Sequence, residues 1–411
     1  MIYANGPSMS SQTATPTKSA SAPSQEDNFH TDQVMTITGG HFMHDTFSAF
    51  LPPLLKEIMT TLGTNYTAAG SLVIFTQLPS VLNPFIGFLA DRMSLRYFVI
   101  LAPAATATLM SAIGLVHSYF ALMLILLAAG VSIAAFHAPA PAMIARVSGK
   151  RVGTGMSLFM AGGELGRTVG PIVVASAVVW WGIDGIWRLA ALGWLTSAVL
   201  WWRLHDVKAD PNRATPSLQT MLPRMQRVFP VLLWIMLPKA FMVVALTTYL
   251  PVFMRDVQHA DLWISAAALT ILEGAGVVGA LLTGTVSDRI GRAQMLLIVL
   301  ILAPILLAAF LFGPDWLIVP ALIGLGLTAI SPTPVLMAVV QDEFPDNRAA
   351  ANGIFMFFTF LVRAGAIAVV GLMADRGGLS QAFFWSGVLA VLSIPAVFRL
   401  PAARVYRGGG A

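Results

Sequence analysis

Six charged side chains of this chain fall inside long apolar stretches of the sequence. Three are acids and three are bases: Asp45, Glu164, Glu273, Arg167, Lys239 and Arg363. A lone charge at the centre of a bilayer costs at least about 2.5–3.5 kcal/mol, so each of these side chains is expected to face a partner or an aqueous cavity. Glu164 and Arg167 are three residues apart and share a helix face, which predicts an ion pair between them.

Asp45 is the first candidate for moving a proton. It lies about eleven residues into an apolar stretch, with His41 one helical turn before it and His44 beside it. A carboxyl group in a low-dielectric cavity can hold a proton near neutral pH, and a nearby imidazole can pass that proton on or stabilise the ionised form. We therefore predict that Asp45 and His41 couple proton movement to transport, with Glu164 and Glu273 as further candidates. The alternative is that Asp45 bonds a nearby hydroxyl group and His41 lies at the membrane interface.

His137 occurs in the sequence Ala-Ala-Phe-His-Ala-Pro-Ala-Pro, which ends at Pro141. Two interpretations stay open: His137 lines a substrate path, or it caps a backbone carbonyl that the neighbouring prolines leave free. A metal site built from His41, His44 and Asp45 is disfavoured, because adjacent residues on a helix diverge by about 100°. We predict no metal site and no cofactor.

Twelve apolar segments must position these side chains, and each can cross about 30 Å of hydrocarbon at 1.5 Å per residue. They cover roughly 34–61, 66–90, 97–116, 120–144, 154–181, 185–204, 229–254, 263–286, 294–313, 316–340, 350–374 and 379–399. Only 10% of all residues are charged and 57% are hydrophobic, as expected for a membrane protein. The sequence thus predicts an all-α membrane protein with twelve transmembrane helices in two pseudo-symmetric six-helix halves.

The two halves carry traces of an internal duplication. The turn Gly87–Arg96 (GFLADRMSLR) is echoed by Gly284–Arg292 (GTVSDRIGR), and each follows a long apolar segment. The pair Pro139 and Pro141 is likewise matched by Pro332 and Pro334 in the other half. Such repeats are typical of secondary transporters, and the prolines predict bends at corresponding places.

Polar segments divide the chain and set its orientation. We expect 1–33 and 401–411 to be disordered cytoplasmic tails, 34–204 and 229–400 to be the two halves, and 205–228 to be a cytoplasmic linker. Most Lys and Arg residues outside the apolar segments fall on the side of the termini, so both termini are predicted to lie in the cytoplasm and the protein in the inner membrane. The net charge of +5 has the same origin, and no nucleic-acid partner is expected.

The repeated turn, placed after the second and eighth helices, resembles the loop signature of the major facilitator superfamily. This resemblance implies the major facilitator fold and a role in conformational switching for the signature residues, which are Gly87, Asp91, Arg92, Gly284, Asp288, Arg289 and Arg292. The first copy departs from the family pattern at Ser94 and Leu95.

Within that superfamily the chain is most similar to the fosmidomycin-resistance-type exporters. The similarity rests on stretches such as His41-Phe-Met-His-Asp45, Phe136-His137, Gly170-Pro171 and Lys239 followed by Tyr249. It implies that Asp45, His137 and Lys239 face the cavity. Glu164 departs from that family, as does the missing acid two residues after His137, so the substrate is expected to differ.

The predicted function is proton-coupled export of a small anionic or amphiphilic organic compound by a monomer. Its substrate contacts would be Arg167, Lys239, Arg363, His137 and Tyr249, because cations suit an anion. The sequence leaves the direction open, and import of a siderophore or organic acid by proton symport is the alternative. A receptor that has lost transport is disfavoured by the intact signatures. An enzyme is not expected, because no phosphate-binding loop or nucleophile elbow is found.

Overall fold

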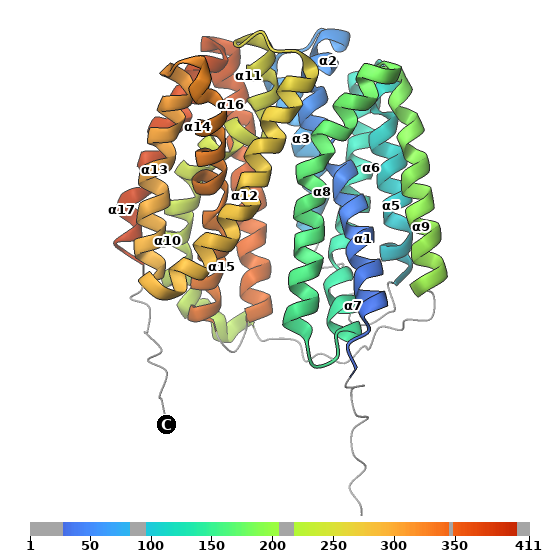
Figure 1. The fold of residues 1–411 in the computed structure, drawn as a ribbon. Coiled ribbons are helices and arrows are strands. Elements are labelled where there is room, and N and C mark those ends of the chain that lie inside the picture. Colours follow the sequence, from blue (N-terminus) through green and yellow to red (C-terminus); the bar gives the residue numbers. More distant parts are fainter. Residues whose placement is uncertain (1–27, 83–95, 205–217, 345–347, 401–411) are drawn as a thin grey trace, which may run out of the picture.

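The computed structural model describes residues 28–82, 96–204, 218–344 and 348–400, and within these ranges every regular element is a helix. Figure 1 shows two helical bundles that stand side by side, one from each half of the chain. The described part of the chain begins at the lower end of this view. In the following, "upper" and "lower" refer to the view in Figure 1.

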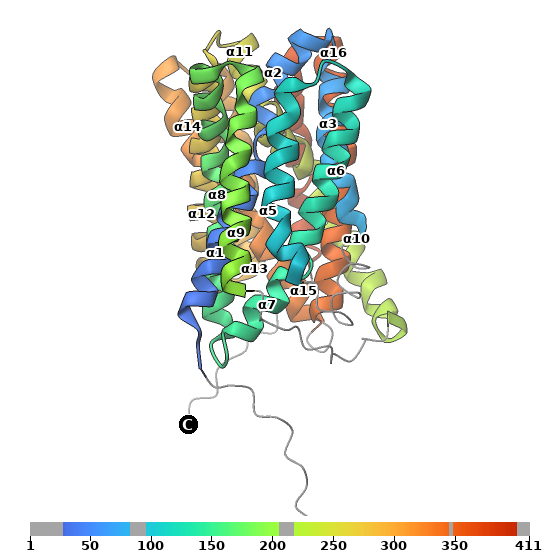
Figure 2. The ribbon, with the colours of Figure 1, turned by 90° about the vertical axis from the view of Figure 1, so that its right-hand side faces the viewer.

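The N-terminal half contains α1 to α9. Their bounds are α1 Thr31–Ser48, α2 Leu51–Leu62, α3 Tyr66–Gln77, η1 Leu78–Leu82, α5 Arg96–Ser111, η2 Ala112–Leu115, α6 Tyr119–His137, α7 Ala140–Val147, α8 Val152–Trp181, η3 Ile183–Leu189 and α9 Ala190–Leu204. Figure 2 shows this half in front, with α5, α6 and α9 on its outer surface.

The C-terminal half contains the remaining helices. Their bounds are α10 Leu218–Val244, η4 Ala245–Tyr249, α11 Leu250–Asp256, α12 Leu262–Ile290, α13 Arg292–Phe312, η5 Asp315–Leu317, α14 Ile318–Leu325, η6 Gly326–Ile330, α15 Pro332–Glu343, α16 Arg348–Val391 and α17 Ile394–Val397. Helix α10 begins inside the predicted linker 205–228. Residues 205–217 of that linker and 1–27 and 401–411 of the predicted tails lie outside the described residues.

The predicted arrangement of twelve membrane helices is confirmed for the described residues, and residues 83–90 of the second predicted helix lie outside them. Among the described residues, eight helical stretches are long and apolar enough to span a bilayer, and the last of these, Ala351–Val397, contains two helices because Gly378 interrupts it at φ 82°. The other three predicted helices correspond to α1 with α2, to α3, and to α8. Apolar length fixes their positions, because a spanning helix satisfies all its backbone hydrogen bonds internally.

Proline interrupts several helices, as predicted. Helix α6 ends at His137, Pro139 follows, and α7 begins at Ala140. At the matching place in the other half, a π-helical turn over Gly326–Ile330 precedes Pro332. Proline removes a backbone donor and clashes with the preceding turn, so each helix changes its course there.

A face of small residues on α8 allows α1 to approach closely. A Cβ atom added at Gly162 would lie 2.8 Å from the carbonyl oxygen of Thr38, and one at Gly166 would lie 3.0 Å from the backbone nitrogen of Thr46. Gly170 also packs against the backbone of Thr46. These close approaches fix the register of α1 against α8.

The two halves meet through α8 with α12 and α3 with α16, and α2 contacts α11 at the upper end (Figure 1). Two ion pairs join α2 to α11: Lys56 Nζ lies 2.5 Å from Asp256 Oδ1, and Arg255 Nη1 lies 3.1 Å from Glu57 Oε1. Hydrogen bonds between the halves gather at the same end, so the upper end is closed in this conformation.

Candidate functional site

Asp45 lies at the centre of a cluster of ionisable groups in the N-terminal half. Its side chain is 2% exposed. His44 Nδ1 lies 3.1 Å from Asp45 Oδ1, His137 Nε2 lies 3.4 Å from the same oxygen, and His41 Nε2 lies 3.4 Å from Oδ2. Arg167 Nη1 lies 3.9 Å from Oδ2. Three helices, α1, α6 and α8, therefore contribute to the surroundings of one carboxylate.

Helix geometry and small residues bring this cluster together. His41 and Asp45 are four residues apart, so they lie on one face of α1. Gly163 on α8 leaves room for the His41 ring, because a Cβ atom at that position would overlap it. His137 is the last residue of α6, two positions before Pro139, and its ring lies against Asp45 of α1.

Backbone carbonyls and aromatic rings fix the orientation of the imidazoles. His41 Nδ1 lies 2.8 Å from the carbonyl oxygen of Phe159, and the two rings stack with centroids 4.0 Å apart. His137 Nδ1 lies 2.9 Å from the carbonyl oxygen of Ile133. One ring nitrogen of His137 thus bonds a carbonyl of its own helix, and the other faces Asp45. The carbonyl of Ile133 is not one that Pro139 or Pro141 leaves free, because its partner in the helix is the N–H of His137.

His44 extends the cluster toward α5 and α6. Its ring stacks on Phe136, and its Nε2 lies 3.1 Å from the hydroxyl oxygen of Thr106. Thr106 in turn forms a hydrogen bond of 2.8 Å with Ser132. Sequence reasoning missed these two hydroxyl groups, because single Ser and Thr residues are common in membrane helices and carry no signal of their partner.

The predicted ion pair between Glu164 and Arg167 is confirmed. These side chains are 34% and 44% exposed although they lie near the middle of α8. Helix α12 passes close by, since a Cβ atom at Gly274 would lie 3.2 Å from Thr168. The neighbouring Glu273 interacts electrostatically with both members of the pair. Charged groups of the two halves thus face one another across α8 and α12.

Two cations of the C-terminal half lie on α10 and α16. Lys239 is 8% exposed and interacts electrostatically with Arg363. Arg363 Nη2 donates a hydrogen bond of 3.1 Å to Thr247 Oγ1. Within the described part of the chain, neither cation forms an ion pair with a carboxylate, although Arg363 interacts electrostatically with Glu273.

Tyr249 lies apart from these groups, at the closed upper end. It has no exposed surface, and its hydroxyl group lies 3.1 Å from the carbonyl oxygen of Ile367 and 3.3 Å from that of Tyr66. In this conformation Tyr249 has no surface with which to touch a substrate. The structure instead places it in the contact between α3 and α16.

The second copy of the repeated turn is described, and the first is not. Arg292 forms ion pairs with Asp288 and, through Nε at 3.4 Å, with Asp342 of α15. Arg289 is exposed, and a Cβ atom added at Gly284 would have no atom within 4 Å. Gly87, Asp91 and Arg92 lie outside the described residues.

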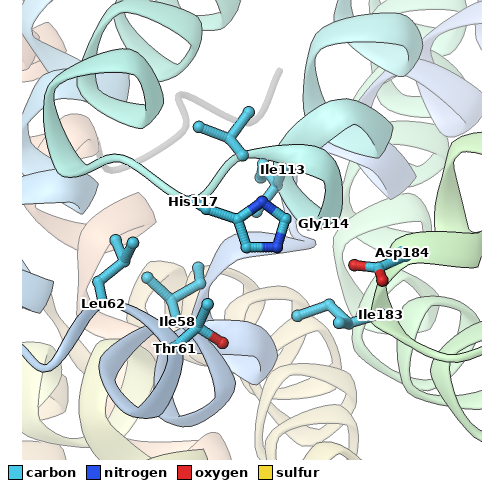
Figure 3. Close-up of a pocket in the computed structure, with 9 residues that line it drawn as sticks. Ile58, Thr61, Leu62, Ile113, Gly114, His117, Ile183 and Asp184 are labelled. Carbon is cyan, nitrogen blue, oxygen red and sulfur yellow. The ribbon is translucent and has the colours of Figure 1, made fainter.

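A small cavity of about 30 Å³ near the upper end of the N-terminal half does not belong to this site (Figure 3). It is bordered mainly by apolar side chains, together with His117 and Asp184. A cavity of that volume holds about one water molecule. We therefore take the charged groups of α1, α6, α8, α10, α12 and α16 as the candidate site.

Comparison with known proteins agrees with this architecture. The Major Facilitator Superfamily model matches residues 37–367. The Fosmidomycin resistance protein of Escherichia coli (strain K12) is 24% identical over 376 residues, which cover 88% of this chain and 91% of that protein.

Solved structures show the same fold at low sequence identity. A bacterial homolog of the human lysosomal transporter Spinster, inward-facing and unoccupied, has a TM-score of 0.74 and 15% identity, covering 91% of this chain and 98% of that one. A D-xylose-proton symporter has a TM-score of 0.71 and 16% identity, covering 92% and 99%. The chain is an integral membrane protein and belongs to the Major Facilitator Superfamily of transporters.

Proposed function

We propose that this protein exports a small anionic or amphiphilic organic compound across the inner membrane in exchange for protons. The observation that carries the proposal is the pair Lys239 and Arg363, two cations inside the C-terminal half that form no ion pair among the described residues. Lys239 is buried and Arg363 is partly buried. Charges at such a place face a partner or an aqueous cavity, and we assign an anionic group of the transported compound as their partner.

The ion pair on α8 would complete the binding site from the other half. Arg167 lies between Asp45 and Glu164, and its charge also acts on Glu273. A compound held by Lys239 and Arg363 on one side and by the Glu164–Arg167 pair on the other would contact both halves. His137, which is 32% exposed, would line the same space. Contact with both halves is what alternating access requires, since the halves move around a central site.

Glu164 and Glu273 are the groups we propose for proton transfer. Glu164 is partly exposed, and Glu273 is intermediate in exposure, so both can exchange protons with water. The groups facing them are Arg167, Arg363 and each other. Asp45 was the first candidate from the sequence, but its carboxylate is enclosed by three imidazoles and lacks such access.

Exchange requires that the protein binds either the proton or the compound, but not both at the same time. A hydroxyl or amine donor of the compound that bonds Glu164 would keep the proton off and would give exchange. The ion pair between Glu164 and Arg167 favours the alternative, proton-coupled import. An anionic compound that displaces Glu164 from Arg167 would bind together with a proton taken up by Glu164. We favour export because the Fosmidomycin resistance protein is a relative over most of the chain.

Orientation follows from the basic residues in this proposal. Arg146, Lys150, Arg151 and Arg203 lie at the lower end, where α1 begins, whereas Lys56 and Arg255 lie at the upper end. The positive-inside rule places the lower end in the cytoplasm. The described conformation, closed at the upper end, would then be open toward the cytoplasm.

The test is proton flux in liposomes. The purified protein is reconstituted with a pH-sensitive dye inside, a proton gradient is imposed, and phosphonates, organic acids, siderophores and cationic drugs are added in turn. We expect an anionic compound to cause proton flux opposite to its own movement. Proton flux in the same direction would establish symport instead. Flux with cationic drugs alone would refute the anion site.

A further inference from the structure

We propose that His41, Asp45 and His137 bind a divalent transition-metal ion such as Zn²⁺. The site would hold α1 to α6 inside the N-terminal half. It shares His137 with the space proposed for the transported compound, but it uses neither Lys239 nor Arg363. Neutral imidazole nitrogens and a carboxylate oxygen are the ligands that such ions take in proteins.

The spacing of the three ligand atoms fits tetrahedral coordination. The two Nε2 atoms of His41 and His137 lie 3.3 Å apart, His41 Nε2 lies 3.4 Å from Asp45 Oδ2, and His137 Nε2 lies 3.4 Å from Asp45 Oδ1. Bonds of 2.0–2.1 Å to a tetrahedral zinc ion place any two ligand atoms about 3.3–3.4 Å apart. The two nitrogen atoms therefore already stand at the separation that a bound ion would impose, and one oxygen of Asp45 lies within 4.8 Å of both.

The orientation of the imidazoles makes both Nε2 atoms acceptors. A carbonyl oxygen only accepts, so Nδ1 of His41 must donate to Phe159 and Nδ1 of His137 must donate to Ile133. In a neutral imidazole the other nitrogen then carries a lone pair. These two lone pairs face the carboxylate of Asp45, whose other polar neighbours are His44 and Arg167. A bound cation would satisfy both nitrogen atoms and the carboxylate.

The outer contacts are those of metal-binding histidines. Ligating imidazoles usually donate their second N–H to a carbonyl or carboxylate, and ligating carboxylates are themselves hydrogen-bonded. Here the carbonyl oxygens of Phe159 and Ile133 hold the two rings, and His44 bonds Asp45 Oδ1 at 3.1 Å. Each of the three ligands thus has a group that fixes its orientation.

The positive charge of Arg167 opposes the binding of a metal ion, but it is compensated by the carboxylate of Glu164. Arg167 lies 3.9 Å from Asp45 Oδ2, but its guanidinium group is paired with Glu164. The exposed side of the site is at His137, which is 32% exposed. The fourth position would take an oxygen ligand from that side.

The prediction of no metal site rested on three residues of one helix, whose side chains diverge. His41, His44 and Asp45 diverge, as argued, but His137 of α6 takes the place of His44 in the converging set. A single histidine 92 positions after Asp45 gives no spacing signal, because the two helices meet only through the tertiary fold.

The test is metal binding by the purified full-length protein after removal of any affinity tag. Co²⁺ serves as the probe, because tetrahedral cobalt has an intense visible absorption, and Zn²⁺ is then added to displace it. We expect one Co²⁺ per chain, displaced by Zn²⁺. His137→Ala and His41→Ala should weaken binding more than about 100-fold, and His44→Ala should weaken it about 10- to 100-fold as a loss of an outer contact.

The matched control is His117→Ala, which removes an exposed histidine of the same half and should leave binding unchanged. Thermal unfolding of each variant without metal shows whether it is folded, and Asp45→Asn provides a second ligand variant of nearly the same shape. Absence of tetrahedral cobalt absorption in the wild-type protein would overturn the proposal. So would equal affinity in His117→Ala and His137→Ala. Proton flux in metal-free liposomes tests the transport proposal separately.

Discussion

Asp375 of α16 holds the N-terminus of α3 in the opposite half, and the variant Asp375→Asn should open the upper end. The carboxylate accepts the backbone N–H of Tyr66 at 2.8 Å and that of Thr67 at 3.0 Å, and it also accepts the hydroxyl of Thr67 at 2.5 Å. The acceptor sites of one side chain thus join α16 to α3. Asparagine keeps one acceptor oxygen and would turn its NH₂ group toward a donor.

The size of the effect follows from these bonds. Hydrogen bonds to a charged group contribute about 1.5–3 kcal/mol each, and the charge at a helix N-terminus adds about 0.3–1 kcal/mol. Asp375→Asn therefore weakens the closed upper end by about 2–3 kcal/mol. Since each 1.4 kcal/mol is a tenfold change, the ratio of closed to open molecules should fall roughly 30- to 150-fold.

The absence of cysteine in the natural sequence makes this measurable. Nitroxide labels on His117→Cys and Asp315→Cys, both exposed near the upper end of different halves, report the distance between the halves by pulsed electron paramagnetic resonance. We expect a longer distance to gain population in Asp375→Asn.

The control for this prediction is Asp261→Asn. Asp261 also caps a helix, accepting the N–H of Ile264 at 2.7 Å, but it acts within one half. The reasoning is refuted if Asp375→Asn leaves the distance distribution unchanged, or if Asp261→Asn changes it as strongly.

Three further predictions concern the packing of α8 against α1, the proposed substrate site and the upper end. Gly166→Ala should lower stability by about 1–3 kcal/mol because its Cβ overlaps the backbone of α1, whereas Gly153→Ala on the same helix, with open space around it, should be neutral or slightly stabilising; thermal unfolding in detergent measures both. Lys239→Ala should weaken binding of the anionic substrate by about 10-fold or more, as measured by titration calorimetry, and equal affinity would remove Lys239 from the site. Breaking the ion pair Lys56–Asp256 with Lys56→Ala should open the upper end less than Asp375→Asn does, because partly exposed ion pairs contribute only about 0–1 kcal/mol.

The helices and their bends could be predicted because their causes are local. Apolar length sets where a membrane helix begins and ends, and Pro139 and Pro332 mark the bends in the fourth and tenth helices. The ion pair of Glu164 and Arg167 was equally predictable, since both residues lie on one helix.

The contacts between helices could not be predicted in this way. Asp45 and His137 meet because glycines of α8 admit α1 and because α6 bends after His137, and neither effect gives a distance from the sequence. Tyr249 shows the reverse case. The sequence analysis predicted a substrate contact for Tyr249, which follows Lys239 in the chain, but the nine residues between them carry it to the closed upper end.

The most direct test of proton-coupled transport is substrate-dependent proton flux in liposomes containing Glu164→Gln. The matched control is Glu343→Gln, which removes a carboxylate at the lower end of α15, away from the proposed site. We predict that Glu164→Gln loses proton flux but still equilibrates the compound down its own gradient, whereas Glu343→Gln behaves as the wild type. Wild-type proton flux with the same pH dependence in Glu164→Gln would contradict the proposed coupling.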